Sequence, residues 1–220
     1  ADDIRLGHMN AGRILFFGNS ITISPMSVAG TNWTGGWGMA ASVSEKDYVH
    51  LVVSAIAKAA GNTPKFKATY NIEFEKNYAT YDFNSPVFQK QLAFKPDIVV
   101  VAIGENVLPL TTPEEQKKYA TAFGNLLEQL KNNGNPRIFV RSCYWADKVK
   151  DDIMKQAALA AGCVFVDQSS LGAQANWAIN ESGNPFQNAG KGVNAHPGDK
   201  SMKAIADSLF ETMATNSKKK

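Results

Sequence analysis

The sequence is poor in the residues that build metal centres and disulfide frameworks. It has two cysteines and three histidines in 220 residues, and these show no spacing typical of metal ligands. We therefore expect no metal and no other cofactor. The cysteines, Cys143 and Cys163, fall near opposite ends of two neighbouring apolar runs, so we expect two free thiols.

Long hydrophobic runs and a strong net charge are also lacking. No stretch is apolar for long enough to cross a bilayer, so we expect no membrane partner. The formal charge is +3, and Lys218, Lys219 and Lys220 account for the same number. A solvated basic tail over residues 215–220 explains this charge better than a nucleic-acid site does, so we expect no nucleic-acid partner.

The start of the chain suggests how the protein is organised. The chain begins with Ala1 rather than Met, which indicates a mature or recombinant form whose leader has been removed, and we expect it to be secreted or periplasmic. Residues 1–12 are polar and contain glycine, so we interpret them as an arm outside the fold. No linker divides the remainder, and we expect one domain over residues 13–214.

Apolar runs alternate with helical patterns along this domain. Strands are predicted at 13–18, 65–74, 97–104, 137–142 and 163–167. Helices are predicted at 46–61, 112–134, 147–162 and 196–214. The alternation predicts an α/β fold, a three-layer α/β/α sandwich around a five-stranded parallel sheet with the flavodoxin-like order 2-1-3-4-5.

The least regular stretches indicate where a functional site would lie. Residues 22–45 and 168–195 follow the first and last predicted strands and are rich in Gly, Ser, Asn and Trp. In sheets of this kind ligands bind at the carboxyl ends of the strands, and long loops there commonly carry function.

A serine and a histidine are expected at this edge of the sheet. Ser20 comes two residues after the first strand, and His196 lies between the last long loop and the last helix. A serine needs an adjacent base to act as a nucleophile at neutral pH, and imidazole has a suitable pKa. The alternatives are that Ser20 only caps the turn and that His196 only begins a helix.

A candidate hydrogen-bond donor follows the third strand, in the stretch Gly104-Glu105-Asn106. The expected strand order places this stretch beside Ser20, so the Asn106 amide could face the same space. Acyl transfer needs donors where the oxyanion forms. The alternative is that Asn106 caps a turn before Pro109.

Together these stretches resemble the SGNH hydrolases, also called the GDSL-like esterase superfamily, and within it a bacterial subgroup of carbohydrate esterases. Gly18-Asn19-Ser20 matches the block with the nucleophile, Gly104-Glu105-Asn106 the block with the oxyanion asparagine, and Ala195-His196-Pro197 the block with the base. The blocks keep the family's order over nearly the whole chain. The resemblance implies that Ser20 attacks, that His196 is the base, and that Asn106 and the Ser20 backbone N–H hold the oxyanion.

The sequence departs from this family at the residue that orients the imidazole. The family has an aspartate three positions before the histidine, and this chain has Val193 there. Asp199 and Glu105 are candidate orienting acids. We favour a Ser-His dyad in which a backbone carbonyl near Val193 accepts the Nδ1 proton, as in some carbohydrate esterases of the superfamily.

A second departure follows the second strand. The family has a glycine block there, and residues 71–75 of this chain give no clear match. Glu73 and Glu75 either contribute polar groups to the pocket or are solvated. The backbone N–H that the glycine usually offers could come from any residue of this segment.

All four tryptophans fall in loops expected at the carboxyl edge: Trp33, Trp37, Trp145 and Trp177. Tryptophan faces stack on sugar rings, and the indole N–H can bind a hydroxyl. We single out Trp37 and Trp145 as candidate substrate-binding residues. The alternative is that each tryptophan packs its own loop onto the core.

The residues and the resemblance together predict a monomeric serine esterase. We expect it to remove acetyl or other short acyl groups from oligo- or polysaccharides through a Ser-His dyad and an acyl-enzyme. Two alternatives stay open. One is a catalytically weak or inactive carbohydrate-binding protein of the same fold, and the other is an SGNH hydrolase of the lipase or thioesterase type.

Overall fold

The computed structural model describes residues 4–218, and within this range five parallel strands form the central sheet. The strands are Arg13–Gly18 (β3), Lys65–Tyr70 (β4), Ile98–Ala102 (β5), Arg137–Arg141 (β6) and Val164–Val166 (β7). They pair in the order β4-β3-β5-β6-β7. Counted along the chain this is 2-1-3-4-5, so the predicted fold class and strand order are confirmed.

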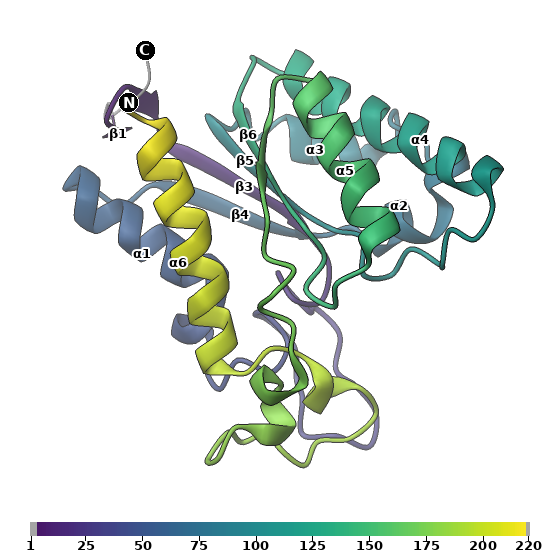
Figure 1. The fold of residues 1–220 in the computed structure, drawn as a ribbon. Helices are drawn as coiled ribbons and strands as arrows, with labels where there is room; N and C mark the ends of the chain where they lie inside the picture. Colours follow the sequence, from purple (N-terminus) through teal and green to yellow (C-terminus); the bar gives the residue numbers. More distant parts are fainter. Residues whose placement is uncertain (1–3, 219–220) are drawn as a thin grey trace.

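Helices cover both faces of the sheet (Figure 1). One face carries Tyr48–Ala60 (α1) and Asp199–Asn216 (α6). The other carries Ile72–Asn77 (α2), Pro86–Leu92 (α3), Pro113–Asn132 (α4) and Lys148–Ala160 (α5). Short 3₁₀ turns occur at Ser44–Lys46, Tyr78–Thr80, Gln174–Asn176, Ala178–Asn180 and Val193–Ala195.

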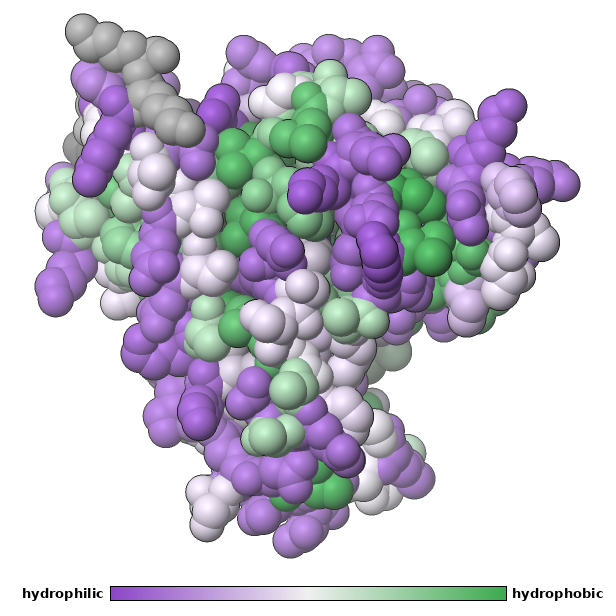
Figure 2. All heavy atoms as spheres, viewed as in Figure 1, coloured by the Kyte–Doolittle hydropathy of each residue, from purple (hydrophilic) through white to green (hydrophobic). Residues whose placement is uncertain are grey.

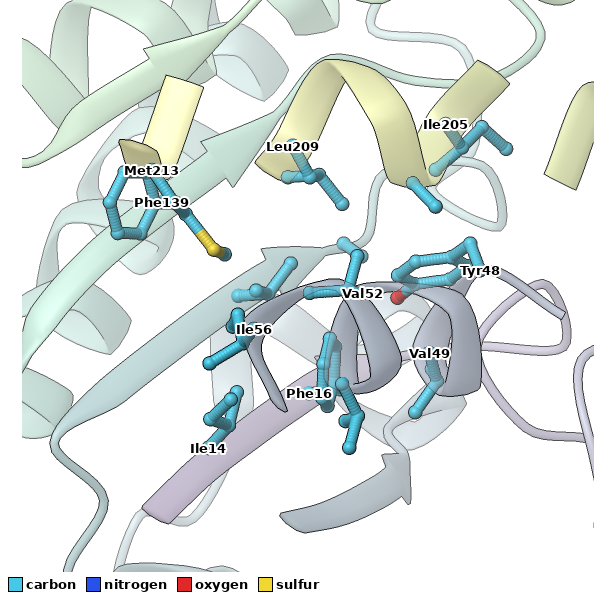
Figure 3. Packing of buried hydrophobic residues seen from close by; sticks show 14 of the residues in the cluster. Ile14, Phe16, Tyr48, Val49, Val52, Ile56, Phe139, Ile205, Leu209 and Met213 are labelled. Atoms are coloured by element: carbon cyan, nitrogen blue, oxygen red, sulfur yellow. The ribbon is translucent and has the colours of Figure 1, made fainter. Parts of the chain in front are cut away.

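The strand β3 explains why both faces are covered. Successive side chains of a strand point to opposite faces, so Ile14 and Phe16 join the core under α1 and α6, while Leu15 and Phe17 join the core under the other helices. Figure 3 shows Ile14 beneath Ile56 and Phe16 beneath Val52, two residues of α1. A continuous apolar run is stable here because neither face meets water.

The segment after β4 differs from the predicted strand 65–74. The strand ends at Tyr70, and α2 begins two residues later. The Asn71 N–H still donates to Gly18 O at 2.7 Å, but the chain then turns into a helix that buries Phe74 in the core. Helix α3 is also absent from the predicted elements, although Ser85 caps it and Pro86 occupies its first turn.

The first residues also differ from the prediction, because the described part of the arm is folded. Residues Arg5–Leu6 (β1) and Met9–Asn10 (β2) pair as an antiparallel hairpin, and Leu6 is buried in the core beneath α1 and α6. The His8 N–H donates to Ser217 O at 2.9 Å, so the hairpin lies against the end of α6. Residues 1–3 of the predicted arm and 219–220 of the predicted basic tail lie outside the described range.

The two long loops pack together into one body, which we call the rim lobe and define as residues 22–45 and 168–195. Figure 1 shows it projecting beyond the carboxyl ends of the strands. Its own small core consists of Trp33, Met39, Ala40, Ala178, Phe186 and Val193. The rings of Trp33 and Phe186, one from each loop, meet edge to face with centroids 5.0 Å apart.

The surface, the helices and the two cysteines show three further properties of the described residues. Hydrophilic residues cover most of the face in Figure 2, with apolar residues in separate patches. Across residues 4–218, no helix combines the length and apolar character needed to span a bilayer. Cys143 and Cys163 are buried free thiols.

Candidate active site

The predicted serine and histidine are in contact at the carboxyl ends of the strands. Ser20 Oγ lies 2.9 Å from His196 Nε2, and His196 Nδ1 lies 2.7 Å from Gly192 O. A carbonyl oxygen can only accept a hydrogen bond, so Nδ1 carries the proton of the neutral ring. Nε2 is therefore unprotonated and faces the hydroxyl, which is the arrangement that a general base requires.

A tight turn after β3 presents the serine. The carbonyl of Asn19 accepts the N–H groups of Thr22 and Ile23, both at 2.9 Å, which closes the turn. Thr22 folds back over Gly18 so closely that a Cβ at position 18 would overlap its hydroxyl. Glycine is therefore required at position 18, and Ser20 is left half-buried at the edge of the sheet.

The rim lobe holds the histidine from the other side. Val193 is 1% exposed and packs in the core of the lobe. The lobe therefore places an apolar side chain where the family has its aspartate, and the carbonyl of Gly192 takes the Nδ1 proton instead. The Ala178 N–H donates to His196 O at 2.9 Å and fixes the backbone of the histidine.

Both candidate orienting acids bind other groups, so the geometry contradicts that part of the prediction. Asp199 accepts the N–H and hydroxyl of Ser42 at 2.7 and 2.6 Å and pairs with Lys46 at 2.9 Å. Glu105 pairs with Arg141 at 2.6 Å and accepts the Tyr144 N–H at 2.8 Å.

Asn106 lies beside a carboxylate at the same end of the sheet. Its Nδ2 donates to Glu75 Oε2 at 2.8 Å, and its backbone N–H donates to Glu75 Oε1 at 3.2 Å. One of the two Nδ2 hydrogens is therefore used, and the second is left for another acceptor. The Ser20 N–H, the other predicted oxyanion donor, has no protein acceptor within residues 4–218.

Asn19 connects two buried carboxylates beneath the serine. Its Nδ2 donates to Glu75 Oε1 at 3.0 Å and to Glu105 Oε2 at 2.7 Å, so both of its hydrogens are used. An aspartate here would add a third carboxylate to the two already present, which explains why this chain has asparagine. Arg141, with a fully buried side chain, supplies one positive charge for the pair.

The environment shifts the pKa values of the site in directions that have clear causes. Burial, and then the charge of Glu105, raise the pKa of Glu75. Burial also tends to raise the pKa of Glu105, but Arg141 and the donors from Tyr144 and Asn19 outweigh it and hold the pKa below its usual value. Burial lowers the pKa of His196, opposed by the Gly192 carbonyl and Glu105.

The two candidate substrate-binding tryptophans have different surroundings. The ring of Trp145 stands perpendicular to the His196 imidazole, with centroids 5.2 Å apart. Trp37 instead packs on Trp33 at 5.1 Å and donates its Nε1–H to Ala41 O at 2.9 Å. Trp145 therefore lies at the site, while Trp37 fits the alternative that a tryptophan packs its own loop.

Sequence reasoning left two members of this cluster unassigned. Glu75 appears in the sequence analysis only as one of two glutamates that either face the pocket or are solvated, and Arg141 only as part of the predicted strand 137–142. The signal for Arg141 was a cation that ends an apolar run at the carboxyl edge, on the strand next to the one that leads to Glu105. Within residues 4–218, no group of three His, Cys, Asp or Glu side chains could hold a metal ion.

No protein-family model matches this sequence, and no curated protein matches it. Solved structures do share its fold. A candidate GDSL-like lipase from Bacteroides uniformis aligns with a TM-score of 0.54 and 14% identity, over 94% of this chain and 97% of its own. A family two carbohydrate esterase from Cellvibrio japonicus gives 0.60 and 17%, over 93% of this chain and 61% of the esterase.

An acetyl xylan esterase from the rumen bacterium Butyrivibrio proteoclasticus gives a TM-score of 0.54 and 15% identity, over 93% of this chain and 63% of its own. At such identities the likeness concerns the fold. The chain has the fold of GDSL-like lipases and carbohydrate esterases, which is the fold that the sequence resemblance predicted.

Proposed function

We propose that the protein is a serine esterase that removes acetyl groups from carbohydrate. The observation that carries this proposal is the 2.9 Å contact between Ser20 Oγ and the unprotonated Nε2 of His196. A hydroxyl in contact with a neutral imidazole, at the ligand-binding edge of a parallel sheet, is the arrangement that nucleophilic acyl transfer needs.

The proposed reaction has two halves that use the same groups. Ser20 Oγ attacks the acetyl carbon while its proton passes to His196 Nε2, and the resulting imidazolium donates that proton to the leaving sugar oxygen. Water then attacks the acetyl-serine, His196 takes one of its protons, and that proton returns to Ser20 Oγ as acetic acid leaves and loses its remaining acidic proton to solvent. The second hydrogen of Asn106 Nδ2 and the Ser20 N–H stabilise the oxyanion in both halves, each donor contributing on the order of 3 kcal/mol.

The carbonyl of Gly192 performs only part of the work of the aspartate that the family has. It holds the tautomer and the ring orientation, because it accepts the Nδ1 hydrogen at 2.7 Å. It carries no full negative charge with which to stabilise the imidazolium. We therefore expect a functional dyad with slower turnover than a complete triad.

Carbohydrate is the proposed substrate class because an aromatic ring borders the reacting groups. Trp145 lies beside His196, where a sugar ring could stack as its acetyl group meets Ser20. The solved structures that share the fold include an acetyl xylan esterase. Because acetylated polysaccharides are too large to enter a cell intact, we propose that the enzyme acts in the periplasm or outside the cell. We also propose that it acts as a monomer.

The second candidate function is carbohydrate binding without significant catalysis. The observation that favours it is the histidine without a carboxylate partner, since Glu105 and Asp199 both bind other groups. A panel test separates the two functions. Wild-type protein is incubated with a fluorogenic acetate ester and with acetylated xylan, mannan, cellulose and chitin oligomers, and the released acetate is measured.

An esterase releases acetate from at least one member of the panel well above the rate of the Ser20→Ala protein. Rates equal to that variant on every substrate, together with calorimetric binding of a glycan, would establish the binding protein instead. Preference for long-chain acyl esters over every acetylated glycan would favour a lipase-type enzyme.

The pH profile of kcat/KM gives a prediction about His196. The base must be neutral, so activity falls as the pH falls through its pKa. Because burial lowers this pKa, we expect the acid limb to lie below about 6.5, the ordinary value for histidine. An acid midpoint at or above that value would contradict His196 as the base.

His50 provides the matched control for this profile. It pairs with Asp47 at 2.8 Å, and the hydrogen bond to that carboxylate raises its pKa. A limb caused by His50 would therefore lie above about 6.5. The His50→Gln variant should keep the wild-type acid limb.

A further inference from the structure

The loop that carries Asn106 is held by one buried carboxylate. Glu75 is 1% exposed, and its Oε1 accepts the N–H of Gly104 at 2.7 Å and that of Asn106 at 3.2 Å. The same oxygen accepts Asn19 Nδ2 at 3.0 Å, and Oε2 accepts Asn106 Nδ2 at 2.8 Å. Four donors from the two segments around the proposed reaction centre therefore converge on one side chain.

A buried cation holds the opposite side of this loop. Lys150 Nζ donates to Val107 O at 2.8 Å and to Gly104 O at 3.3 Å. Gly104 has φ +127°, and a Cβ there would overlap Cys143 Sγ. The loop backbone is thus fixed by an anion on its N–H groups and by an ammonium on its carbonyl groups.

The remaining freedom of Asn106 is the orientation of its amide. An amide can exchange its oxygen and nitrogen by a half-turn of the side chain. An ionised carboxylate only accepts hydrogen bonds, so Glu75 Oε2 repels the amide oxygen and attracts Nδ2. The orientation that satisfies Glu75 is the one that leaves a second N–H for the oxyanion.

We propose that Glu75 is a positioning residue that orients the Asn106 amide as an oxyanion donor and ties it, through Asn19, to the turn that presents Ser20. The proposal rests on the esterase function proposed above. It assigns a role to the segment after β4, where the family block had no match. Glu75 acts through Asn106 and does not touch the substrate.

Glu75→Gln is the informative substitution because it keeps size and shape. Three donors meet at the Oε1 position, so the glutamine oxygen occupies that position and its NH2 group faces Asn106 Nδ2. Two donors cannot pair, so the Asn106 amide turns over or withdraws. We expect kcat to fall on the order of 100-fold, the effect of losing one oxyanion donor, with KM nearly unchanged.

Glu73→Gln is the matched control. Glu73 lies on the same short helix, is exposed, and its carboxylate accepts Asn77 Nδ2 at 2.6 Å. We expect kcat and KM to stay within about twofold of wild type, because an exposed change of this kind alters little. A similar loss of kcat in both variants would overturn the specific role of Glu75.

A double-mutant cycle with Asn106→Ala tests whether Glu75 acts through the amide. In the Asn106→Ala background, Glu75→Gln should lower kcat by no more than about twofold, because the group that it positions is already absent. Independent effects that multiply would show that Glu75 acts by another route and would overturn the proposal. Thermal unfolding of each variant identifies any loss that comes from instability.

A second variant covers the case in which Glu75→Gln fails to fold. In Glu75→Gln/Asn106→Asp the glutamine NH2 group donates to the carboxylate introduced at position 106, so the contact between the two side chains is restored. That carboxylate has no N–H to offer to the oxyanion. This protein should fold and be as slow as Asn106→Ala. Wild-type kcat in this double variant would overturn the proposal.

The Asn106 side-chain NH2 resonances give a readout that does not depend on activity. They should shift in Glu75→Gln and stay in place in Glu73→Gln. If wild-type protein is inactive on every ester, the proposed function fails, while this shift still decides whether Glu75 orients the amide. Unchanged resonances would contradict the positioning role.

Discussion

Replacing Ser20 with alanine is expected to lower kcat for acetate release by at least about 10⁴-fold, because no other group can form the acyl-enzyme. The imidazole and the oxyanion donors remain in place, so a small residual rate comes from water activated by His196. Glycan binding should be nearly unchanged, since the hydroxyl is one small group at the edge of the site. The measurement is acetate release from the best substrate of the panel, with glycan binding followed by calorimetry.

Ser27→Ala is the control for this variant. Ser27 is exposed and lies in the long loop that follows the turn of Ser20, seven residues further along the chain. Its removal should leave kcat within about twofold of wild type. Persistence of wild-type turnover in Ser20→Ala would exclude Ser20 as the nucleophile and with it the proposed reaction.

Replacing Arg141 with methionine is expected to lower the free energy of unfolding at pH 7 by about 3–5 kcal/mol. Its guanidinium pairs with Glu105 inside a cluster that also contains Glu75. Methionine leaves two buried carboxylates facing the same amide without compensation. Urea unfolding at pH 7 measures the change.

The loss should depend on pH in a definite direction. In the wild type the pKa of Glu105 is held down, so its pairing contributes stability above its unfolded pKa and loses that contribution as the pH falls. The difference between wild type and Arg141→Met should therefore shrink on acidification. A constant difference from neutral to acid pH would argue against the charge as the cause.

Two further variants separate this charge effect from lost packing. Arg141→Met/Glu105→Gln removes the unpaired carboxylate and should recover part of the lost stability. Arg137→Met changes an exposed arginine on the same strand, whose Nη2 donates to Asn216 Oδ1 at 3.2 Å, and should cost less than about 1 kcal/mol. Equal losses in the Arg141 and Arg137 variants would contradict the special role of the buried pair.

The sheet and the serine–histidine contact could be anticipated because both depend on patterns that are local in sequence. Strand β5 begins with four consecutive β-branched residues, and α4 has the Thr112 cap and Pro113 that mark a helix start. Parallel order then brings the ends of distant strands to one edge. Ser20 and His196, 176 residues apart, meet there for that reason.

The cluster of Glu75, Glu105 and Arg141 beneath Ser20 could not be predicted from local sequence patterns. Burial is inferred from apolar periodicity, and Glu75 and Arg141 interrupt that pattern. Each is buried because of a partner contributed by another element, and the local sequence does not identify that partner. The N-terminal hairpin was missed for a similar reason, since two strands of two residues are too short to show alternation.

The hydrogen bond from His8 to Ser217 joins the first and last turns of the chain at the edge of the sheet opposite the reacting groups. A partner module fused next to either of these residues would lie at that end of the sheet and leave the edge with Ser20 and His196 open. The same closeness of His8 and Ser217 would allow a short peptide to join the chain there and the chain to be reopened elsewhere. The protein is thus suited to circular permutation. It is also suited to display on a surface with the edge that carries Ser20 and His196 facing outward.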